Sequence, residues 1–312
     1  MITIVAGVDG GGTKTRVVIA DETGKTLADV EGPASAVRPG HVDQSAAAIG
    51  GTVRHALEEA ELGLVVPRVL SVGVAGVGRE PERQALWQAL AAMEIADEVI
   101  VNTDAMIALD DAFSDGVGVL LIAGTGSFCF GRGPSGTVAR CGGWGPVIGD
   151  EGSGAWIGRR ALSVVTAASD GREPETALIG AILTAAQVND VNDLVAWAAA
   201  ATPAALATLA PAVISEADAG DLRANAILSM AAEELVLHIR ALARQLFVDE
   251  RAAVPVALTG GLLKRGAPLR KRLEQRMKSA VPGAQLQGGE VDAARGAVRD
   301  ALRILAGGSV RA

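Results

Sequence analysis

The chain has 312 residues, which is enough for two domains of ordinary size and for a core that needs neither disulfides nor metal. Glycine occupies 39 positions, whereas aromatic residues make up only 3% and tyrosine is absent. The net charge is −8, with acidic and basic residues mixed along the chain, and this excludes an extended nucleic-acid footprint. Two cysteines exclude a disulfide scaffold and indicate a reducing, cytoplasmic location.

No segment of the sequence predicts a leader or a membrane span. The start, MITIVAGVDGGG, lacks the basic region and the long apolar stretch of a signal peptide. Leu194–Ser215 carries no charge and is long enough to cross a bilayer, but it is rich in alanine and contains Pro203 and Pro211. Thr202-Pro203 is typical of a helix start. We therefore expect buried helices there, and no membrane partner.

Strands and helices alternate in the first part of the chain, which favours α/β layers. All-apolar or β-branched runs bounded by glycine predict the strands, and 3.6-residue periodicity predicts the helices. The predicted strands are Ile2–Val8, Arg16–Ala20, Thr26–Val30, Val69–Val74 and Glu98–Val101, and the predicted helices are Asp43–Glu61, Glu80–Met93 and Asp104–Phe113.

The pattern then starts again, with a glycine turn between strands. Thr13 and Gly24 are 11 residues apart, as are Thr125 and Gly136, so strand, turn and strand recur as an internal repeat. A mostly helical segment follows Gly152. Later elements are strands Val117–Ala123, Phe128–Gly131, Thr137–Arg140 and Val254–Thr259, and helices Leu262–Lys278 and Val291–Leu305.

Both turns of the repeat are candidates for binding phosphate. Gly7–Thr15 is not a P-loop, because Thr13 stands where that motif requires lysine and a β-branched run follows instead of a helix. Backbone N–H groups in such a turn can donate to phosphate oxygens. A single turn of this kind is also compatible with an ordinary hairpin; two at matched positions favour phosphate binding.

These motifs resemble those of a known family. Asp9–Thr15 and Gly124–Ser127 look like the two phosphate motifs of the actin-like sugar kinase and ATPase superfamily, and Val256–Gly261 resembles its adenosine motif. Cys141–Gly145 and Gly149–Gly154 are similar to the BadF/BadG/BcrA/BcrD group, which includes eukaryotic N-acetylglucosamine kinase.

The resemblance implies an α/β fold of duplicated actin-like, ribonuclease H-like domains with ATP and sugar in an interdomain cleft. The expected domains are residues 1–114 and 115–312, the last helix lying in the second domain or packing back on the first. The implied activity is ATP-dependent phosphorylation of an amino sugar at its 6-hydroxyl, with Mg²⁺ as cofactor.

The resemblance also assigns roles to residues. Asp104 would accept the proton of the sugar hydroxyl, and Asp9 would hold Mg²⁺ through water; each has an ordinary alternative, as a helix cap and a turn residue respectively. The implied nucleotide-binding residues are Gly10, Gly11, Gly12, Thr13, Lys14, Gly124, Thr125, Gly126, Ala217, Gly260 and Gly261, and the implied sugar-binding residues are Ser35, Ser127, Gly143, Trp144, Gly145 and Asp150.

Alternatives stay open at this stage. The loop after the third strand offers only Ser35 or Ala36 where relatives have asparagine, and Phe128 replaces another asparagine, so the acceptor could be N-acetylglucosamine, glucosamine, N-acetylmuramic acid or another hexose derivative. An ATP-driven activator of an electron-transfer enzyme would need cysteine ligands for an iron–sulfur cluster. A non-catalytic sugar sensor is a third class. We expect a homodimer, the commonest oligomer.

Overall fold

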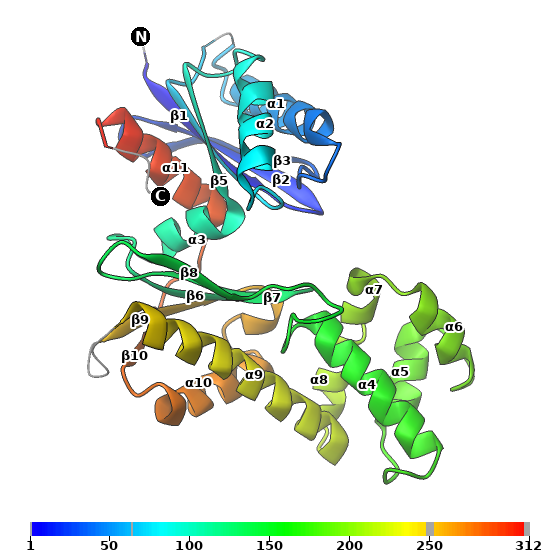
Figure 1. Ribbon diagram of the computed structural model, residues 1–312. Helices are drawn as coiled ribbons and strands as arrows, with labels where there is room; N and C mark the ends of the chain where they lie inside the picture. The colour runs from blue at the N-terminus through cyan, green and yellow to red at the C-terminus, as the bar shows by residue number, and fades with distance from the viewer. Residues whose placement is uncertain (1, 64, 248–252, 309–312) are drawn as a thin grey trace. The chain divides into compact units, whose positions relative to one another are not determined.

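The computed structural model describes residues 2–63, 65–247 and 253–308, and the chain divides into two compact units (Figure 1). Unit 1 comprises residues 1–116 and 289–312, and unit 2 comprises residues 117–288. Residues 289–312 thus count with unit 1.

Unit 1 is built on a five-stranded mixed sheet with the order β3-β2-β1-β4-β5. The first three strands are antiparallel, and β1, β4 and β5 are parallel, so the carboxyl ends of these last three meet at one edge. The strands are β1 (Ile4–Gly10), β2 (Lys14–Asp21), β3 (Thr26–Pro33), β4 (Val69–Val74) and β5 (Glu98–Thr103), and the helices are α1 (Val42–Glu59), α2 (Glu80–Ala91), α3 (Asp104–Ala112) and α11 (Ala293–Leu305).

Helices cover both faces of this sheet (Figure 1). Alternate residues of β1 point to opposite faces: Ile4 and Val8 join the core under α1 and α2, whereas Val5 joins the core under α11. Close approach of α11 requires glycine at two points. A Cβ on Gly7 would lie 2.5 Å from the backbone nitrogen of Val298, and one on Gly296 would lie 1.9 Å from the carbonyl oxygen of Ile107.

Unit 2 repeats the same sheet design. Its order is β10-β9-β6-β7-β8, with β6, β7 and β8 antiparallel and β6, β9 and β10 parallel. The strands are β6 (Gly118–Ala123), β7 (Ser127–Arg132), β8 (Val138–Gly142), β9 (Val254–Thr259) and β10 (Ala284–Leu286); the helices are α4 (Gly154–Ser169), α5 (Leu178–Ala186), α6 (Asp193–Ala200), α7 (Pro203–Ala207), α8 (Ala210–Asp218), α9 (Leu222–Leu246), the 3₁₀ turn η1 (Gly261–Leu263) and α10 (Pro268–Ala280).

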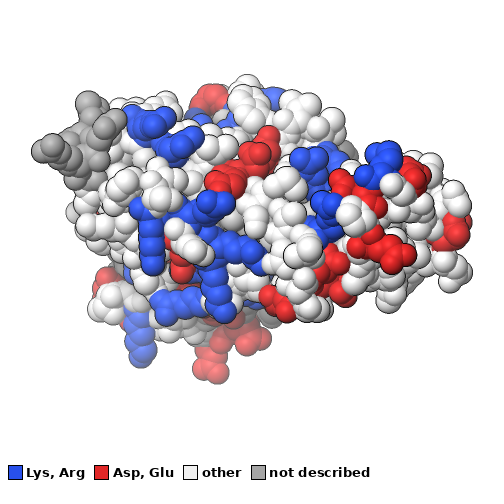
Figure 2. Space-filling model, turned by 90° about the horizontal axis from the view of Figure 1, so that it is seen from below, with Lys and Arg blue, Asp and Glu red and all other residues white. Residues whose placement is uncertain are grey.

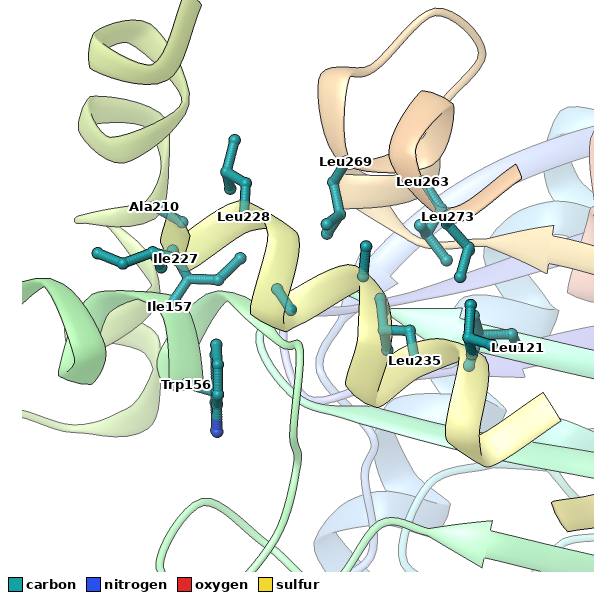
Figure 3. Close-up of a cluster of buried hydrophobic side chains, with 14 of the residues drawn as sticks. Leu121, Trp156, Ile157, Ala210, Ile227, Leu228, Leu235, Leu263, Leu269 and Leu273 are labelled. Atoms are coloured by element: carbon teal, nitrogen blue, oxygen red, sulfur yellow. The ribbon is translucent and has the colours of Figure 1, made fainter. Parts of the chain in front are cut away.

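The core of unit 2 forms between the sheet and the long helix α9 (Figure 3). Leu121 of β6, Leu235 of α9 and Leu273 of α10 are all fully buried in it, and Ile157 brings α4 onto the same cluster. The predicted α/β class and the duplication of the strand–turn–strand unit are confirmed by the two matching sheets.

Two helical predictions need correction. The segment Leu262–Lys278 is not one helix, because Gly266 adopts a left-handed φ of +81° and Pro268 begins α10. Leu194–Ser215 forms α6, α7 and α8 as separate short helices, with Thr202 capping α7, but α7 has no buried residue and so is not a core helix. Among the described residues, no helix is both long and apolar enough to span a membrane.

Candidate functional site

The first glycine turn borders an open cavity in unit 1. The N–H of Gly11 donates to the carbonyl of Lys14 at 2.9 Å, which closes the turn, while the chain at Gly12 and Thr13 is exposed. The cavity has a volume of about 530 Å³. It is lined by Asp9, the turn residues 11–14, Arg16, residues 290–293 and Arg295.

A buried hydroxyl pair supports the turn from below. Thr15 Oγ1 donates to Ser35 Oγ at 2.6 Å, and the N–H groups of Ser35 and Ala36 both donate to the carbonyl of Gly11 at 3.1 Å. A Cβ on Gly10 would lie 2.5 Å from Ser35 Oγ, so only glycine fits over this hydroxyl. Ser35 is 1% exposed, which places the predicted sugar contact beneath the turn rather than on the open surface.

Asp9 lies among charges of both signs. It faces Arg16 across the β1–β2 pair. Burial, followed by the negative charges of Asp104 and Asp292, raises the pKa of Asp9 to about 6, and the positive charges of Arg16 and Lys14 oppose this shift. Asp9, the predicted metal ligand, and Asp104, the predicted base, therefore interact electrostatically within unit 1.

Asp104 is the first residue of α3, at the carboxyl end of β5. The cap is Thr103, whose Oγ1 accepts from the N–H of Met106 at 3.2 Å, so Asp104 is not needed as the helix cap. Burial raises the pKa of Asp104, while a hydrogen bond from the N–H of Ala105 to its Oδ1, at 2.9 Å, acts in the opposite direction. A carboxylate of raised pKa at this edge of the sheet suits a general base.

The C-terminal segment completes the wall of the cavity, which the sequence did not predict. Arg16 donates from Nη1 to both oxygens of Asp292 at 2.9 Å, and Asp111 accepts from the N–H of Asp292 at 2.7 Å and from Arg295 Nε at 2.6 Å. The one available signal was the Gly288-Gly289 pair shortly before Asp292.

The second glycine turn, in unit 2, is held by the start of α4. The N–H groups of Gly154 and Ala155 donate to the carbonyls of Gly124 and Thr125, at 2.8 and 3.1 Å. The hydroxyl of Ser127 is buried and donates to the carbonyl of Glu151 at 2.7 Å. The helix is capped by Ser153, whose side chain accepts from the N–H of Trp156, so Asp150 and Glu151 lie in the loop before it.

The loop between β8 and α4 holds four of the six predicted sugar residues, namely Gly143, Trp144, Gly145 and Asp150. Gly142, Gly143, Gly145 and Asp150 all adopt left-handed φ angles, which gives the loop its tight path. The N–H of Gly145 donates to Asp150 Oδ1 at 3.1 Å. Asp150 also lies beside the second turn, since a Cβ on Gly126 would lie 2.8 Å from its Oδ2.

The exposure of Trp144 and the raised pKa of Asp150 make this loop a candidate binding surface. Trp144 is 66% exposed. Burial raises the pKa of Asp150, and a hydrogen bond from Gly145 opposes the shift. An open indole face next to a carboxylate of raised pKa can hold a pyranose ring and accept from its hydroxyls.

The residues predicted to bind adenosine lie at two different elements of unit 2. Gly260 has a left-handed φ of +101°, and a Cβ on it would lie 2.3 Å from the carbonyl oxygen of Ala123, so this glycine packs against the strand before the second turn. Ala217 is buried in the last turn of α8, and α9 begins after its cap, Asp221. Its carbonyl accepts from Asn225 Nδ2 at 2.8 Å.

Charge is less evenly mixed than expected around α10. The segment Lys264–Lys278 contains seven lysines and arginines and one acidic residue, and Figure 2 shows such side chains gathered on the face that carries α10. Three of the seven are engaged locally: Arg270 pairs with Glu274, Arg276 pairs with Glu233, and Arg272 donates to Asn225.

The model of the BadF/BadG/BcrA/BcrD ATPase family matches residues 6–301. The chain belongs to this family. Two curated relatives are similar over nearly their full length: the N-acetyl-D-glucosamine kinase of Dictyostelium discoideum is 31% identical, covering 96% of this chain and 98% of the relative, and the N-acetylmuramic acid/N-acetylglucosamine kinase of Clostridium acetobutylicum is 30% identical, covering 94% and 96%.

A solved structure agrees with these relatives. A crystal structure from Chromobacterium violaceum, provisionally named an N-acetylglucosamine kinase, is 33% identical and superposes with a TM-score of 0.78, covering 96% of this chain and 98% of that one. The predicted family is thereby confirmed, and with it the nucleotide class, because the family is one of ATPases.

Proposed function

We propose that this family member transfers the γ-phosphoryl group of ATP to the 6-hydroxyl of an amino sugar, with N-acetyl-D-glucosamine or D-glucosamine as the acceptor. One observation carries the proposal: Asp9 and Asp104 lie at the same carboxyl edge of the unit 1 sheet, where Asp104 raises the pKa of Asp9 beside the open glycine-turn cavity. The names of the relatives, all amino-sugar kinases, point to the acceptor.

In this mechanism Asp104 accepts the proton of the sugar hydroxyl as that oxygen attacks the γ-phosphorus, and the bond to the ADP oxygen breaks. The exposed backbone N–H groups at Gly12 and Thr13 donate to phosphate oxygens, and Lys14 adds positive charge. Gly124, Thr125 and Gly126 form the second phosphate cradle, and Gly260 and Gly261, with Ala217, border adenosine.

Asp9 is the residue that we expect to hold Mg²⁺. The described residues contain no group of three or more His, Cys, Asp or Glu side chains placed to bind a metal. Mg²⁺ in phosphoryl-transfer sites needs only one or two carboxylates, because phosphate oxygens and water supply the other ligands, and the crowding of negative charge around Asp9 suits such an ion. When bound, it neutralises charge on the phosphates.

On the sugar side, Trp144 stacks on the pyranose, and Asp150, Ser127, Gly143 and Gly145 contact its hydroxyl and amide groups. Ser35 acts from beneath the first turn. The reaction requires that the acceptor held by unit 2 reach Asp104 of unit 1 in the ternary complex. Small-angle scattering should therefore show compaction when sugar and a non-hydrolysable ATP analogue are added together; an unchanged profile would count against this step.

The decisive experiment is a coupled ADP-release assay over hexoses, hexosamines and their N-acetyl derivatives. We expect N-acetylglucosamine or glucosamine to raise ATP turnover well above its sugar-free rate. If no sugar does so, the kinase proposal fails. Phosphorylation at a position other than the 6-hydroxyl, read by NMR of the product, would correct the regiochemistry only.

The alternative activity is activation of an electron-transfer enzyme, which would need cysteine ligands for an iron–sulfur cluster. The positions of the two cysteines give little support for such a cluster. Cys129 is fully buried in β7, directly opposite Cys141 of β8, and its sulfur has no access to a shared surface cluster. An iron assay on anaerobically purified protein distinguishes the two activities. We also propose a homodimer working in the cytoplasm, where two unpaired thiols stay reduced; analytical ultracentrifugation tests the dimer.

A further inference from the structure

Arg140 covers one face of the exposed tryptophan. Its guanidinium carbon lies 5.0 Å from the centroid of the Trp144 ring, within the range of a cation–π contact. Arg140 belongs to β8, two residues before the loop, and its side chain is exposed. Because the cation occupies one face of the indole, a pyranose ring can stack only on the other.

Other charged side chains near this loop have local polar partners. Asp150 accepts from the N–H of Gly145, Arg159 donates to the carbonyl of Pro146, and Glu151 lies 3.6 Å from His238. Within the part of the chain that the structure describes, Arg140 has no carboxylate partner. Its one polar contact is a long 3.5 Å bond to the carbonyl of Gly143.

A second arginine–tryptophan pair shows what a purely structural contact of this kind looks like. The guanidinium carbon of Arg160 lies 5.3 Å from the ring centroid of Trp156 on α4. Trp156 is only 9% exposed and is part of the unit 2 core (Figure 3). The two pairs differ in the exposure of the ring: Trp156 is covered by core residues, whereas the open ring of Trp144 leaves a face on which a ligand can stack.

We infer that Arg140 is a specificity-determining residue that favours an acceptor amino sugar carrying a carboxylate. The inference rests on the proposed function, because it takes Trp144 as the platform for the sugar. A planar guanidinium presents paired N–H donors that match a carboxylate. A sugar on the free face of Trp144 reaches these donors only through a substituent that extends past the edge of the indole, as a carboxylate-bearing side group does. Neutral N-acetylglucosamine would use the same platform without this contact.

The test compares two probes, N-acetylmuramic acid, which has a carboxylate on a lactyl ether, and N-acetylglucosamine. In the unmodified enzyme both should be phosphorylated. Arg140→Gln should lower kcat/KM for N-acetylmuramic acid by about 30-fold, mainly through KM, since a hydrogen bond to a charged group is lost. The same variant should lower kcat/KM for N-acetylglucosamine by only about 3-fold, through the lost stacking on Trp144.

Four further measurements keep the result unambiguous. Arg140→Lys should restore part of the preference for the anionic sugar, and raising the salt concentration should weaken that preference in the unmodified enzyme. Arg160→Gln, the matched control on the buried pair, should leave the ratio of the two kcat/KM values unchanged. A thermal unfolding midpoint for each variant verifies that it is folded.

Two results would overturn the inference while leaving the kinase proposal standing. One is phosphorylation of N-acetylglucosamine with no activity on N-acetylmuramic acid. The other is an equal loss for both sugars in Arg140→Gln, which would make Arg140 a support for Trp144 alone. Failure of every sugar to raise ATP turnover is a distinct outcome, because it removes the proposed function itself.

Discussion

The two glycine turns close equivalent hairpins but carry different side chains. At the first turn Asp9 faces Arg16 across the strand pair, and at the second Ile122 faces Phe128. Their supports differ as well: the N–H of Ser35 bonds to the first turn, and the start of α4 bonds to the second. The duplicated sheet thus supplies two turns of similar backbone, and the charged pair across the first turn is the reason why the proposed function places the chemical step in unit 1.

The largest effect should come from the base beside the first turn. Asp104→Asn keeps an oxygen for the N–H of Ala105, so the protein should fold and bind ATP, but kcat should fall roughly 10²- to 10⁴-fold. Steady-state kinetics with ATP binding measured by calorimetry checks this. Asp43→Asn, which changes an exposed aspartate in the first turn of α1, serves as the control. Near-normal turnover of Asp104→Asn would remove the assigned base.

Two glycine substitutions, one at the end of β1 and one directly after β6, test whether the two hairpins are packed equally tightly. Gly10→Ala places a methyl group 2.5 Å from Ser35 Oγ and 2.8 Å from Val74 Cγ2, and should lower the free energy of unfolding by about 1–3 kcal/mol. Gly124→Ala meets no atom within 4 Å, so the change should stay within about 0.5 kcal/mol. Urea denaturation of both variants gives the comparison; equal losses would show that the turns are not distinguished by packing.

The pH dependence of stability should originate at the first turn. The pKa of Asp9 is raised from 3.8 to about 6, so the folded state holds its proton more firmly than the unfolded state does. The stability linked to protonated Asp9 is complete below pH 3.8 and is lost as the pH rises through about 6. Relative to Asp9→Asn, the unmodified protein should therefore lose about 1–2 kcal/mol over this range, given the partial exposure of Asp9.

Unfolding midpoints from pH 4 to pH 8 (about two units on either side of the shifted pKa) should be measured without Mg²⁺ and then with it. Added Mg²⁺ should recover part of the loss in the unmodified protein and none in Asp9→Asn, because the ion offsets the charge that burial penalises. Parallel pH profiles for the two proteins would contradict the link between Asp9 and stability.

Local patterns made most of the fold predictable, and distant partners explain what was missed. The strands Val69–Val74 and Val254–Thr259 were predicted to the residue, because each is an apolar run with a clear boundary. The short strand Ala284–Leu286 is mostly exposed and offers no such run. The Arg16–Asp292 pair joins positions 276 residues apart, a contact that depends on α11 returning to β1 and that no local pattern encodes.

The smallest effect should come from the recognition side. Trp144→Ala removes the stacking platform and should raise KM for the sugar about 3- to 10-fold with little change in kcat, because an aromatic contact contributes about 0.5–1.5 kcal/mol. Trp144→Phe should retain most of the affinity, and Trp87→Ala, which removes a half-exposed tryptophan of α2, should leave KM for the sugar unchanged. Steady-state kinetics at saturating ATP measures both constants. A large fall in kcat for Trp144→Ala would mean that the loop after β8 also orders the reacting groups. The proposed difference, with the chemical step at the first turn and sugar binding beside the second, would then be wrong.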